Sequence, residues 1–272
     1  MAGTERLRQI TEAVRSAGRA GVAELAALTG ASEMTIRRDL EALAAQGVLE
    51  RYRGGARSLL LRGEESPFAL RAQEGLEAKR RIAAEVAGLI ADGESVVLDS
   101  GTTCLEVARA LEHRRVTVMP LSLHAVNALA GAPHVTLLVP GGRPRPGELA
   151  LTGPLTQASL AALRFDTAVI GCCGLNSADG LTAYDMDDAA VKRAAIASSR
   201  RVIAVAEAAK LTRTALAFVT AAADLDAVVT DGNFTDGNFS EGSFSEGSFS
   251  DGTTPTGETD RLVAAGVAVR TV

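Results

Sequence analysis

The apolar residues at the start of the chain recur at the spacing of short amphipathic helices. Leu7, Ile10 and Val14 are separated by three and four positions, so they lie on one face of a first helix that ends at Gly18. The apolar positions of residues 22–29 indicate a second, shorter helix. These patterns predict two helices before position 30.

A third helix follows over residues 33–46. Ile36, Leu40 and Leu43 fall on one of its faces, and Ser32 just before it is a residue type that caps helix N-termini well. After this helix the pattern predicts a short strand pair, with a strand at 48–53 and a glycine turn at 54–55. A short helix, a tight turn and a second helix match the spacing of a helix-turn-helix.

From residue 79 onward the pattern changes to short apolar runs that alternate with helical stretches. The runs suited to buried strands lie at 95–98, 116–119, 135–139, 167–170, 202–206, 216–219, 227–229 and 267–272. The helical stretches include 79–91, 103–112, 155–163 and 188–199, with one more before the last strand. Such alternation is typical of an α/β fold with a mainly parallel sheet and helices on both faces.

The changes of pattern divide the chain into a helical head, a linker and an α/β body. We place these parts at 1–57, 58–78 and 79–272. A length of 272 residues is about right for one small and one medium domain.

One segment of the body, residues 231–256, departs from both patterns. It repeats five residues as DGNFT, DGNFS, EGSFS, EGSFS and DGTTP, and it holds four of the chain's seven Phe. A period of five keeps Phe on neither face of a helix nor of a strand. A square β-helix of pentapeptide repeats needs stacked coils, and four copies make only about one coil. We therefore predict an inserted low-complexity loop without function, with a partner-binding loop as the alternative.

Composition excludes several classes of protein. The chain is 47% hydrophobic and 22% charged, which is typical of a globular protein. Its apolar runs are far shorter than a membrane span, and its first 15 residues lack a signal-peptide core, so we expect a cytoplasmic protein that does not contact a membrane. Three Cys and three His lack disulfide or metal-ligand spacing, so we expect no metal and no cofactor.

Charge is distributed unevenly between head and body. Residues 1–57 hold nine Arg against seven acidic residues, whereas the remainder holds 19 basic and 26 acidic residues. A mildly basic head on an acidic body is the asymmetry of a nucleic-acid-binding protein. Only three of the 28 basic residues are Lys, which we attribute to GC-rich coding rather than to selection for Arg.

The third helix carries side chains suited to reading DNA. In a helix-turn-helix the second helix enters the major groove, where Arg binds guanine through two hydrogen bonds and Thr contacts base edges or phosphates. Arginines of the strand pair that follows suit phosphate contact as a wing. The candidate DNA-binding residues are Ser32, Met34, Thr35, Arg37, Arg38, Arg51, Arg53 and Arg57. The alternative is that Arg37 pairs with Glu41 and that Arg38 only solvates the surface.

In the body, the turn after the strand at 95–98 is the main candidate for a binding site. Asp99-Ser-Gly-Thr-Thr103 joins that strand to a helix, and amides at a helix N-terminus favour an anion. Ordinary helix capping by Thr102 or Thr103 is an equal alternative. Ligands of open parallel sheets lie at the carboxyl ends of strands, where further small residues and an Arg occur. The candidates for this sugar-phosphate pocket are Asp99, Ser100, Gly101, Thr102, Thr103, Ser122, Gly141, Gly142, Arg143, Gly171 and Gly174.

The run Thr35-Ile-Arg-Arg-Asp-Leu40 and the later Gly54-Gly55-Ala56, with Arg6 and Ile10 upstream, form a specific combination. With these residues the head closely resembles the DeoR family of bacterial transcriptional regulators. The resemblance implies a winged helix-turn-helix with 33–46 as its recognition helix, and double-stranded operator DNA as its partner.

The body carries the resemblance further. The turn from Leu98 to Thr103, the Gly141-Gly142 pair, the helix with Lys192 and the later Lys210 look like the sensor domain of this family. The resemblance implies a fold similar to ribose-phosphate isomerases and CoA transferases. It also implies a phosphorylated sugar or related metabolite as ligand, and repression of a carbohydrate-metabolism operon as the usual outcome. Lys192 and Lys210 are candidates to neutralise the phosphate, with a surface salt bridge as the alternative for each.

A homo-oligomer is expected, because turning two sensor domains changes the spacing of two recognition helices, which must match the half-sites of the operator.

Two departures from the family pattern leave the identity of the ligand open. The family usually has Thr-Asn-Ser where this chain has Pro120-Leu121-Ser122, and it tends to Asp-x-Ser-Lys where this chain has Glu207-Ala-Ala-Lys210.

Two other functions are consistent with the residues. One is a constitutive DNA binder with a degenerate sensor. The other is a sugar-phosphate isomerase, which needs a carboxylate base near a substrate carbon. The acidic candidates for that role are Asp99, Asp185, Asp187 and Asp188, and no motif identifies a base among them. We therefore expect a regulator and not an enzyme.

Overall fold

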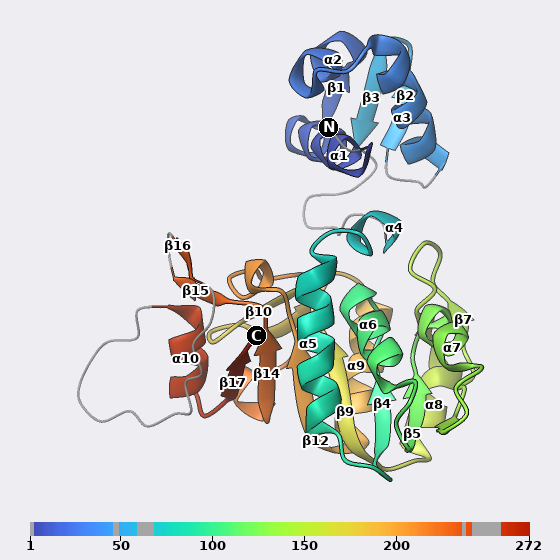
Figure 1. Cartoon of the computed structure of the whole chain (residues 1–272), viewed down its shortest axis with the longest axis vertical. Coiled ribbons are helices and arrows are strands. Elements are labelled where there is room, and N and C mark those ends of the chain that lie inside the picture. Colours follow the sequence, from blue (N-terminus) through green and yellow to red (C-terminus); the bar gives the residue numbers. More distant parts are fainter. Residues whose placement is uncertain (1–2, 46–48, 59–67, 236–237, 241–256) are drawn as a thin grey trace. The chain divides into compact units, whose positions relative to one another are not determined.

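The computed structural model describes residues 3–45, 49–58, 68–235, 238–240 and 257–272 (Figure 1). The expected strand start at 48, residues 59–67 of the expected linker and the repeat copies from 241 onward lie outside the described residues. The chain divides into two compact units, Met1–Glu74 and Gly75–Val272. The second unit therefore begins one residue before its first helix, α5 (Leu76–Leu89).

The first unit is a winged helix-turn-helix. Its helices are α1 (Gly3–Ala17), α2 (Val22–Thr29), α3 (Glu33–Ala45) and the short α4 (Phe68–Arg71), and its strands are β1 (Arg19–Gly21), β2 (Leu49–Tyr52) and β3 (Gly55–Ser58). The strands form an antiparallel sheet in the order β1-β3-β2, in which β2 and β3 are the wing. The three predicted helices and the strand pair are confirmed. The pattern does not predict β1, because three residues carry too little periodicity.

The predicted apolar faces form the core of this unit. Ile10, Leu25, Ile36, Leu40 and Leu43 are each at most 1% exposed and pack in one cluster. The helix-turn-helix geometry thus follows from burial of the faces that the helical spacing predicts.

The second unit is built on a seven-stranded sheet. Its order is β17-β14-β12-β9-β4-β5-β6, and every neighbouring pair is parallel. The strands are β4 (Ser95–Leu98), β5 (Val116–Pro120), β6 (Val135–Leu137), β9 (Phe165–Gly171), β12 (Ser199–Val205), β14 (Ala227–Thr230) and β17 (Ala268–Thr271). The predicted α/β fold with a mainly parallel sheet is confirmed.

Helices cover both faces of this sheet (Figure 1). Besides α5 they are α6 (Thr102–Leu111), α7 (Leu123–Leu129), α8 (Pro154–Ala161), α9 (Met186–Ala197) and α10 (Glu258–Ala264), with the short η1 (Ala208–Lys210) and η2 (Ala222–Asp224). Neighbouring strand residues serve opposite faces: Val97 belongs to the apolar cluster that contains Ala189 of α9, whereas Leu98 belongs to the cluster that contains Ile82 of α5. None of the described helices is long and apolar enough to cross a membrane.

One predicted strand belongs to a different sheet. The run expected at 216–219 forms β13 (Ala217–Thr220), which pairs antiparallel with β11 (Gly180–Ala183). Strand β11 pairs in turn with β10 (Gly174–Asn176), so these three form a small second sheet. An apolar run indicates burial but not a partner, which is why the sequence does not separate the two sheets. A ribbon is formed by β7 (Arg143–Pro144) and β8 (Leu151–Thr152).

The first copies of the repeat form a hairpin rather than the predicted loop. Strands β15 (Asn233–Thr235) and β16 (Asn238–Ser240) pair antiparallel, with Phe234 opposite Phe239. The period of five is compatible with strands because each copy supplies three strand residues, and only Asp236 and Gly237 separate the two strands in the sequence. Asp-Gly is a residue pair that favours a tight hairpin. Residues 233–235 and 238–240 are therefore strands where the sequence predicts a loop, and the absence of a function in the repeat stays a prediction.

Candidate functional site

Helix α3 turns its polar face away from the core of the first unit. Ile36 and Leu40 are buried, whereas Met34 is 66% exposed and both Arg37 and Arg38 are exposed. A rotation of about 100° per residue produces this separation. The helix thus presents one continuous surface of candidate DNA-binding side chains.

The two arginines of α3 differ in their surroundings. Arg37 forms an ion pair with Glu33 one turn earlier, with 2.7 Å between Nη2 and Oε2. The alternative pairing with Glu41 is wrong, because Glu41 instead lies 3.5 Å from Arg51 of the wing. Arg38 forms no ion pair with any residue that the structure describes. Of the two, Arg38 is the more available to DNA.

The wing carries three exposed arginines. Arg57 donates to Glu50 across the β2–β3 pair at 2.8 Å, and Arg51 is the partner of Glu41 named above. Arg53, in the turn between the strands, has no ion pair within the described part of the chain. Exposed ion pairs contribute only about 0–1 kcal/mol, so a DNA phosphate can displace them.

Ser32 and Thr35 together hold the start of α3. The amide of Thr35 donates to Ser32 Oγ at 3.2 Å, and the two hydroxyl oxygens are 2.9 Å apart. Ser32 is therefore a helix cap, as its residue type predicts. Its hydroxyl holds the N-terminus of the recognition helix. A DNA contact of Ser32 would use the same hydroxyl that already bonds Thr35.

Asp39 connects α3 to α1. Arg6 donates to it, with 2.6 Å between Nε and Oδ2, and the two side chains are 20% and 14% exposed. The hydrogen bond to Asp39 raises the pKa of Arg6. This pair orients the recognition helix on the first helix. The sequence contains the signal, a carboxylate directly beside the buried Leu40, but Asp39 is not among the candidate DNA-binding residues.

In the second unit, the turn Asp99–Thr103 joins β4 to α6 at the carboxyl edge of the sheet. The N-cap residue of α6 is Gly101, with φ 101° and ψ 169°, and no side chain caps the helix. The alternative of ordinary capping by Thr102 or Thr103 is therefore wrong. The first amides of α6 carry the partial positive charge that favours an anion.

Asp99 lies at the centre of a buried network. Its Oδ2 accepts a hydrogen bond from the amide of Gly171 at 2.9 Å and forms an ion pair with Lys192. The Lys192 ammonium also lies 3.4 Å from Asp188, one turn earlier in α9. Gly171 approaches the turn closely, since a Cβ there would lie 3.2 Å from the carbonyl oxygen of Ser100. The network joins β4, β9 and α9 at one edge of the sheet.

The charge of Lys192 is offset inside the protein by the two carboxylates that face it. Burial raises the pKa of Asp99. Burial also lowers the pKa of Lys192, but Asp188 and Asp99 outweigh that effect and hold it well above the ordinary value of a lysine. Lys192 is therefore protonated and faces two carboxylates. Contrary to the expectation from the sequence, it has little charge to offer a phosphate.

The loop Gly141-Gly142-Arg143 leads from β6 toward the ribbon. The hydroxyl of Thr156 donates to the carbonyl of Gly141 at 2.8 Å, and a Cβ on Gly142 would lie 2.0 Å from that hydroxyl. Both glycines thus serve close packing against α8. Arg143 is different, since its side chain is 79% exposed and lies 3.8 Å from Asp187 in the first turn of α9.

The remaining candidates are divided between packing and the edge of the sheet. Ser122 is 2% exposed and caps α7, and Gly174 leaves room for the carbonyl oxygen of Arg213, 2.3 Å from where its Cβ would stand. Lys210, in η1, donates to the carbonyl of Cys172 at 2.9 Å. Lys210 therefore lies next to Gly171 and to the Asp99 network, whereas Gly174 has a packing role.

The chain's three lysines gather at this one edge. Lys79 is 1% exposed and Lys192 is 3% exposed, while Lys210 is half-buried. Lys79, in the first turn of α5, lies 3.5 Å from Glu207, which follows β12. Every other basic residue of the chain apart from His is Arg. Coding bias explains why Lys is rare, but it does not explain why the three Lys residues lie at the same edge of the sheet. The sequence analysis does not name Lys79 or Glu207 as site residues.

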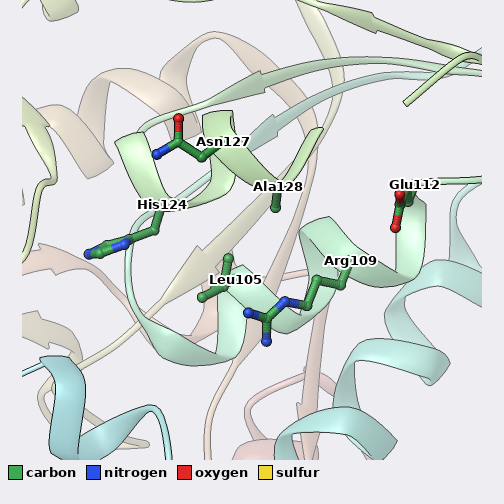
Figure 2. A pocket seen from close by; sticks show the side chains of 6 residues that line it. All are labelled: Leu105, Arg109, Glu112, His124, Asn127 and Ala128. Atoms are coloured by element: carbon green, nitrogen blue, oxygen red, sulfur yellow. The ribbon is translucent and has the colours of Figure 1, made fainter. Parts of the chain in front are cut away.

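A hollow of about 470 Å³ lies between α6 and α7 (Figure 2). Its lining residues are Leu105, Arg109, Glu112, His124, Asn127 and Ala128. None of the candidate ligand-site residues is among these six. Burial lowers the pKa of His124. His124, Asn127 and Ala128 of this lining belong to α7, a helix that the sequence pattern does not predict.

Both units match known family models. The model described as DeoR-like helix-turn-helix domain matches residues 6–60, and the model described as DeoR C terminal sensor domain matches residues 74–232. A solved ribose 5-phosphate isomerase A from Methanocaldococcus jannaschii overlaps 51% of this chain and 56% of its own, at 17% identity and a TM-score of 0.39.

Curated relatives match along most of their length. The glycerol-3-phosphate regulon repressor of Escherichia coli strain K12 is 32% identical over 232 residues, which are 85% of this chain and 92% of the relative. The HTH-type transcriptional regulator GlpR of Haloferax volcanii is 32% identical over 85% of this chain and 91% of its own. The transcriptional repressor AccR of Agrobacterium fabrum is 32% identical over 84% and 89%.

Proposed function

The chain belongs to the DeoR family of transcriptional regulators, and we propose that it represses a carbohydrate-metabolism operon until a phosphorylated sugar or related metabolite releases it from operator DNA. DNA binding and transcription regulation come with the family. The relatives described as repressors support the sign of the regulation. They are regulators rather than enzymes, so the proposal assigns no reaction to the chain.

The DNA interface is the exposed face of α3 together with the wing. Arg38 and Arg37 face the major groove in this proposal, and Arg38 makes the base contact because it has no ion pair in the described part of the chain. Arg53 and Arg51 contact phosphates on either side. Asp39 acts indirectly, because its ion pair with Arg6 fixes the orientation of α3 relative to α1.

The observation that carries the ligand proposal is the uncapped N-terminus of α6 at the carboxyl edge of a parallel sheet. Its amides suit a phosphate, and parallel sheets bind ligands at this edge. Since Lys192 is already balanced by Asp99 and Asp188, we assign the cations to Lys210 and Arg143. The Asp99 network then fixes the shape of the turn rather than the charge of the ligand.

Release from DNA requires more than one copy of the chain. Two recognition helices bind half-sites about one helical turn apart, or a multiple of it, so a rotation between two sensor units spoils their spacing. We therefore propose a homo-oligomer with operator half-sites arranged to match. Typical coupling of about 1–3 kcal/mol corresponds to a fall in DNA affinity of roughly 5- to 150-fold.

The test is a gel shift with the DNA upstream of the chain's own and neighbouring genes. The shift is repeated with sn-glycerol 3-phosphate, ribose 5-phosphate, fructose 6-phosphate and N-acetylgalactosamine 6-phosphate, and with each unphosphorylated parent as the matched control. Release by one phosphate and not by its parent supports the proposal. Binding that no phosphate changes would identify a constitutive DNA binder and would contradict the ligand part of the proposal.

A further inference from the structure

Glu207 lies at the start of the second unit although it is distant in sequence. Its Oε1 is 3.5 Å from the ammonium of Lys79, in the first turn of α5. Its Oε2 lies 2.6 Å from where a Cβ on Gly75 would stand. Gly75 is both the N-cap residue of α5 and the residue at which the second unit begins. One carboxylate therefore contacts the place where the chain arrives from the DNA-binding unit.

The same residue is connected to the candidate ligand site. Glu207 is followed by η1, where the amide of Lys210 donates to the carbonyl of Glu207 at 2.8 Å. The Lys210 ammonium reaches the carbonyl of Cys172, which follows the Gly171 that donates to Asp99. Burial raises the pKa of Glu207, while Lys79 and Lys210 act in the opposite direction. The carboxylate is thus affected by both lysines, of which Lys79 lies 3.5 Å from it.

We propose that Glu207 is the positioning residue that links ligand binding at the 99–103 turn to helix α5 and, along the chain, to the DNA-binding unit. The proposal rests on the proposed function. A phosphate at the turn attracts Lys210 and repels the carboxylate of Glu207. Lys79 is 1% exposed and cannot follow by moving into solvent, so displacement of Glu207 shifts the first turn of α5. That turn immediately follows the residues that come from the first unit.

Three variants separate this role from a contribution to folding. Glu207→Gln keeps the shape and removes the charge. The double variant Lys79→Met/Glu207→Gln removes both charges, so it leaves no unpaired buried charge and keeps the unit folded. Gly75→Ala displaces the Glu207 carboxylate without removing it, because the new Cβ takes its place. The matched control is Gly93→Ala, since Gly93 also has a positive φ, +90°, but no atom lies within 4 Å of its Cβ position.

The first readout needs no ligand. In the full-length protein, all three variants relax the start of α5 toward its ligand-bound arrangement, so operator affinity falls at least about fivefold, within the ordinary range of allosteric coupling. Amide exchange in residues 75–82 becomes faster, while exchange in the seven-stranded sheet is unchanged. Gly93→Ala leaves both quantities at the wild-type value. Unchanged operator affinity in Glu207→Gln and Gly75→Ala would overturn the proposal.

The second readout uses the phosphate that releases the wild type among the four compounds named above. The coupling factor, which is the ratio of operator Kd with and without that phosphate, falls from roughly 5–150 toward one in the variants. The Kd of the phosphate itself, measured by calorimetry, is retained. Retained coupling in the double variant would overturn the proposal. If no phosphate releases the wild type, the ligand part of the proposed function fails, and the ligand-free readout alone decides the role of Glu207.

Discussion

Asp99 and Lys192 form a buried ion pair although 93 positions separate them in the sequence. Asp99 directly follows β4 and Lys192 projects from α9, so the pair ties the turn at the start of α6 to a helix on the other face of the sheet. Asp188 shares the same ammonium. The conformation of the Asp99–Thr103 turn therefore depends on the Lys192 ammonium, a charge that the protein itself supplies.

Removal of that charge is predicted to destabilise the second unit. Lys192→Met leaves Asp99 and Asp188 buried without their cation, and breaking a buried pair in this way costs about 3–5 kcal/mol. Urea unfolding of the variant and of the wild type measures the difference. The neighbouring Arg193→Met, on the exposed side of α9, is the control and is expected to lose about 1 kcal/mol or less. Equal losses in the two variants would contradict the role given to Lys192.

The stability that Lys192 contributes is predicted to disappear only at alkaline pH. Its pKa in the folded state is raised above the unfolded value of about 10.4, so the contribution is fully present below that pH. It is lost as pH rises through the folded-state pKa. The difference in unfolding free energy between wild type and Lys192→Met is expected to be constant from pH 7 to about 10 and to shrink above it.

The arginines of α3 are predicted to set operator affinity. Arg38→Ala removes an exposed side chain opposite the buried Ile36 and Leu40, so folding is unaffected. Loss of a two-bond base contact costs about 1–3 kcal/mol and relaxes specificity at one base pair. Arg53→Ala instead weakens binding to all DNA alike and reduces the salt dependence. If Arg37→Ala/Arg38→Ala binds the operator as tightly as the wild type, the assignment of α3 to the groove is wrong.

The sequence predicts this fold well wherever apolar residues recur at a regular spacing and the face that they form has only one element to pack against. Ile36, Leu40 and Leu43 define α3, and the alternation of runs defines the parallel sheet. It fails for β13, since an apolar run does not say which sheet will bury it. In the repeat, the Asp-Gly hairpin signal is present, but the spacing of Phe conceals it.

The candidate site shows the same division between local and distant information. The turn Asp99–Thr103 is visible in the sequence because strand, small residues and helix are contiguous. The pairing of Asp99 with Lys192, and of Lys79 with Glu207, depends on strand order and helix placement. A lysine on a helix looks alike in the sequence whether it faces solvent or a carboxylate. The charge balance that leaves Lys192 with little to offer a phosphate is therefore a property of the fold.

The last copies of the repeat are predicted to be dispensable, whereas its first residue is not. Asp231 accepts a hydrogen bond from the amide of Ala208 at 2.7 Å and so holds the start of η1. Replacing residues 241–256 by a short Gly-Ser linker is expected to leave the melting temperature and operator affinity unchanged, because surface insertions cost little. Asp231→Ala is expected to cost about 1 kcal/mol. A loss of several degrees in the deletion would contradict the prediction for the last copies.

Ligand and operator are predicted to weaken each other by the same factor. If the phosphate lowers operator affinity roughly 5- to 150-fold, linkage requires that operator DNA lower phosphate affinity equally. Calorimetric titration of the phosphate into the protein, and into its DNA complex, measures the phosphate affinity without and with operator DNA. The gel shift measures the operator affinity. Thr102→Ala/Thr103→Ala alters the turn without touching α3 and is expected to weaken the phosphate in both titrations. Equal phosphate affinity in the two titrations would rule out release by that ligand, and unchanged affinity in the variant would place the phosphate away from the N-terminus of α6.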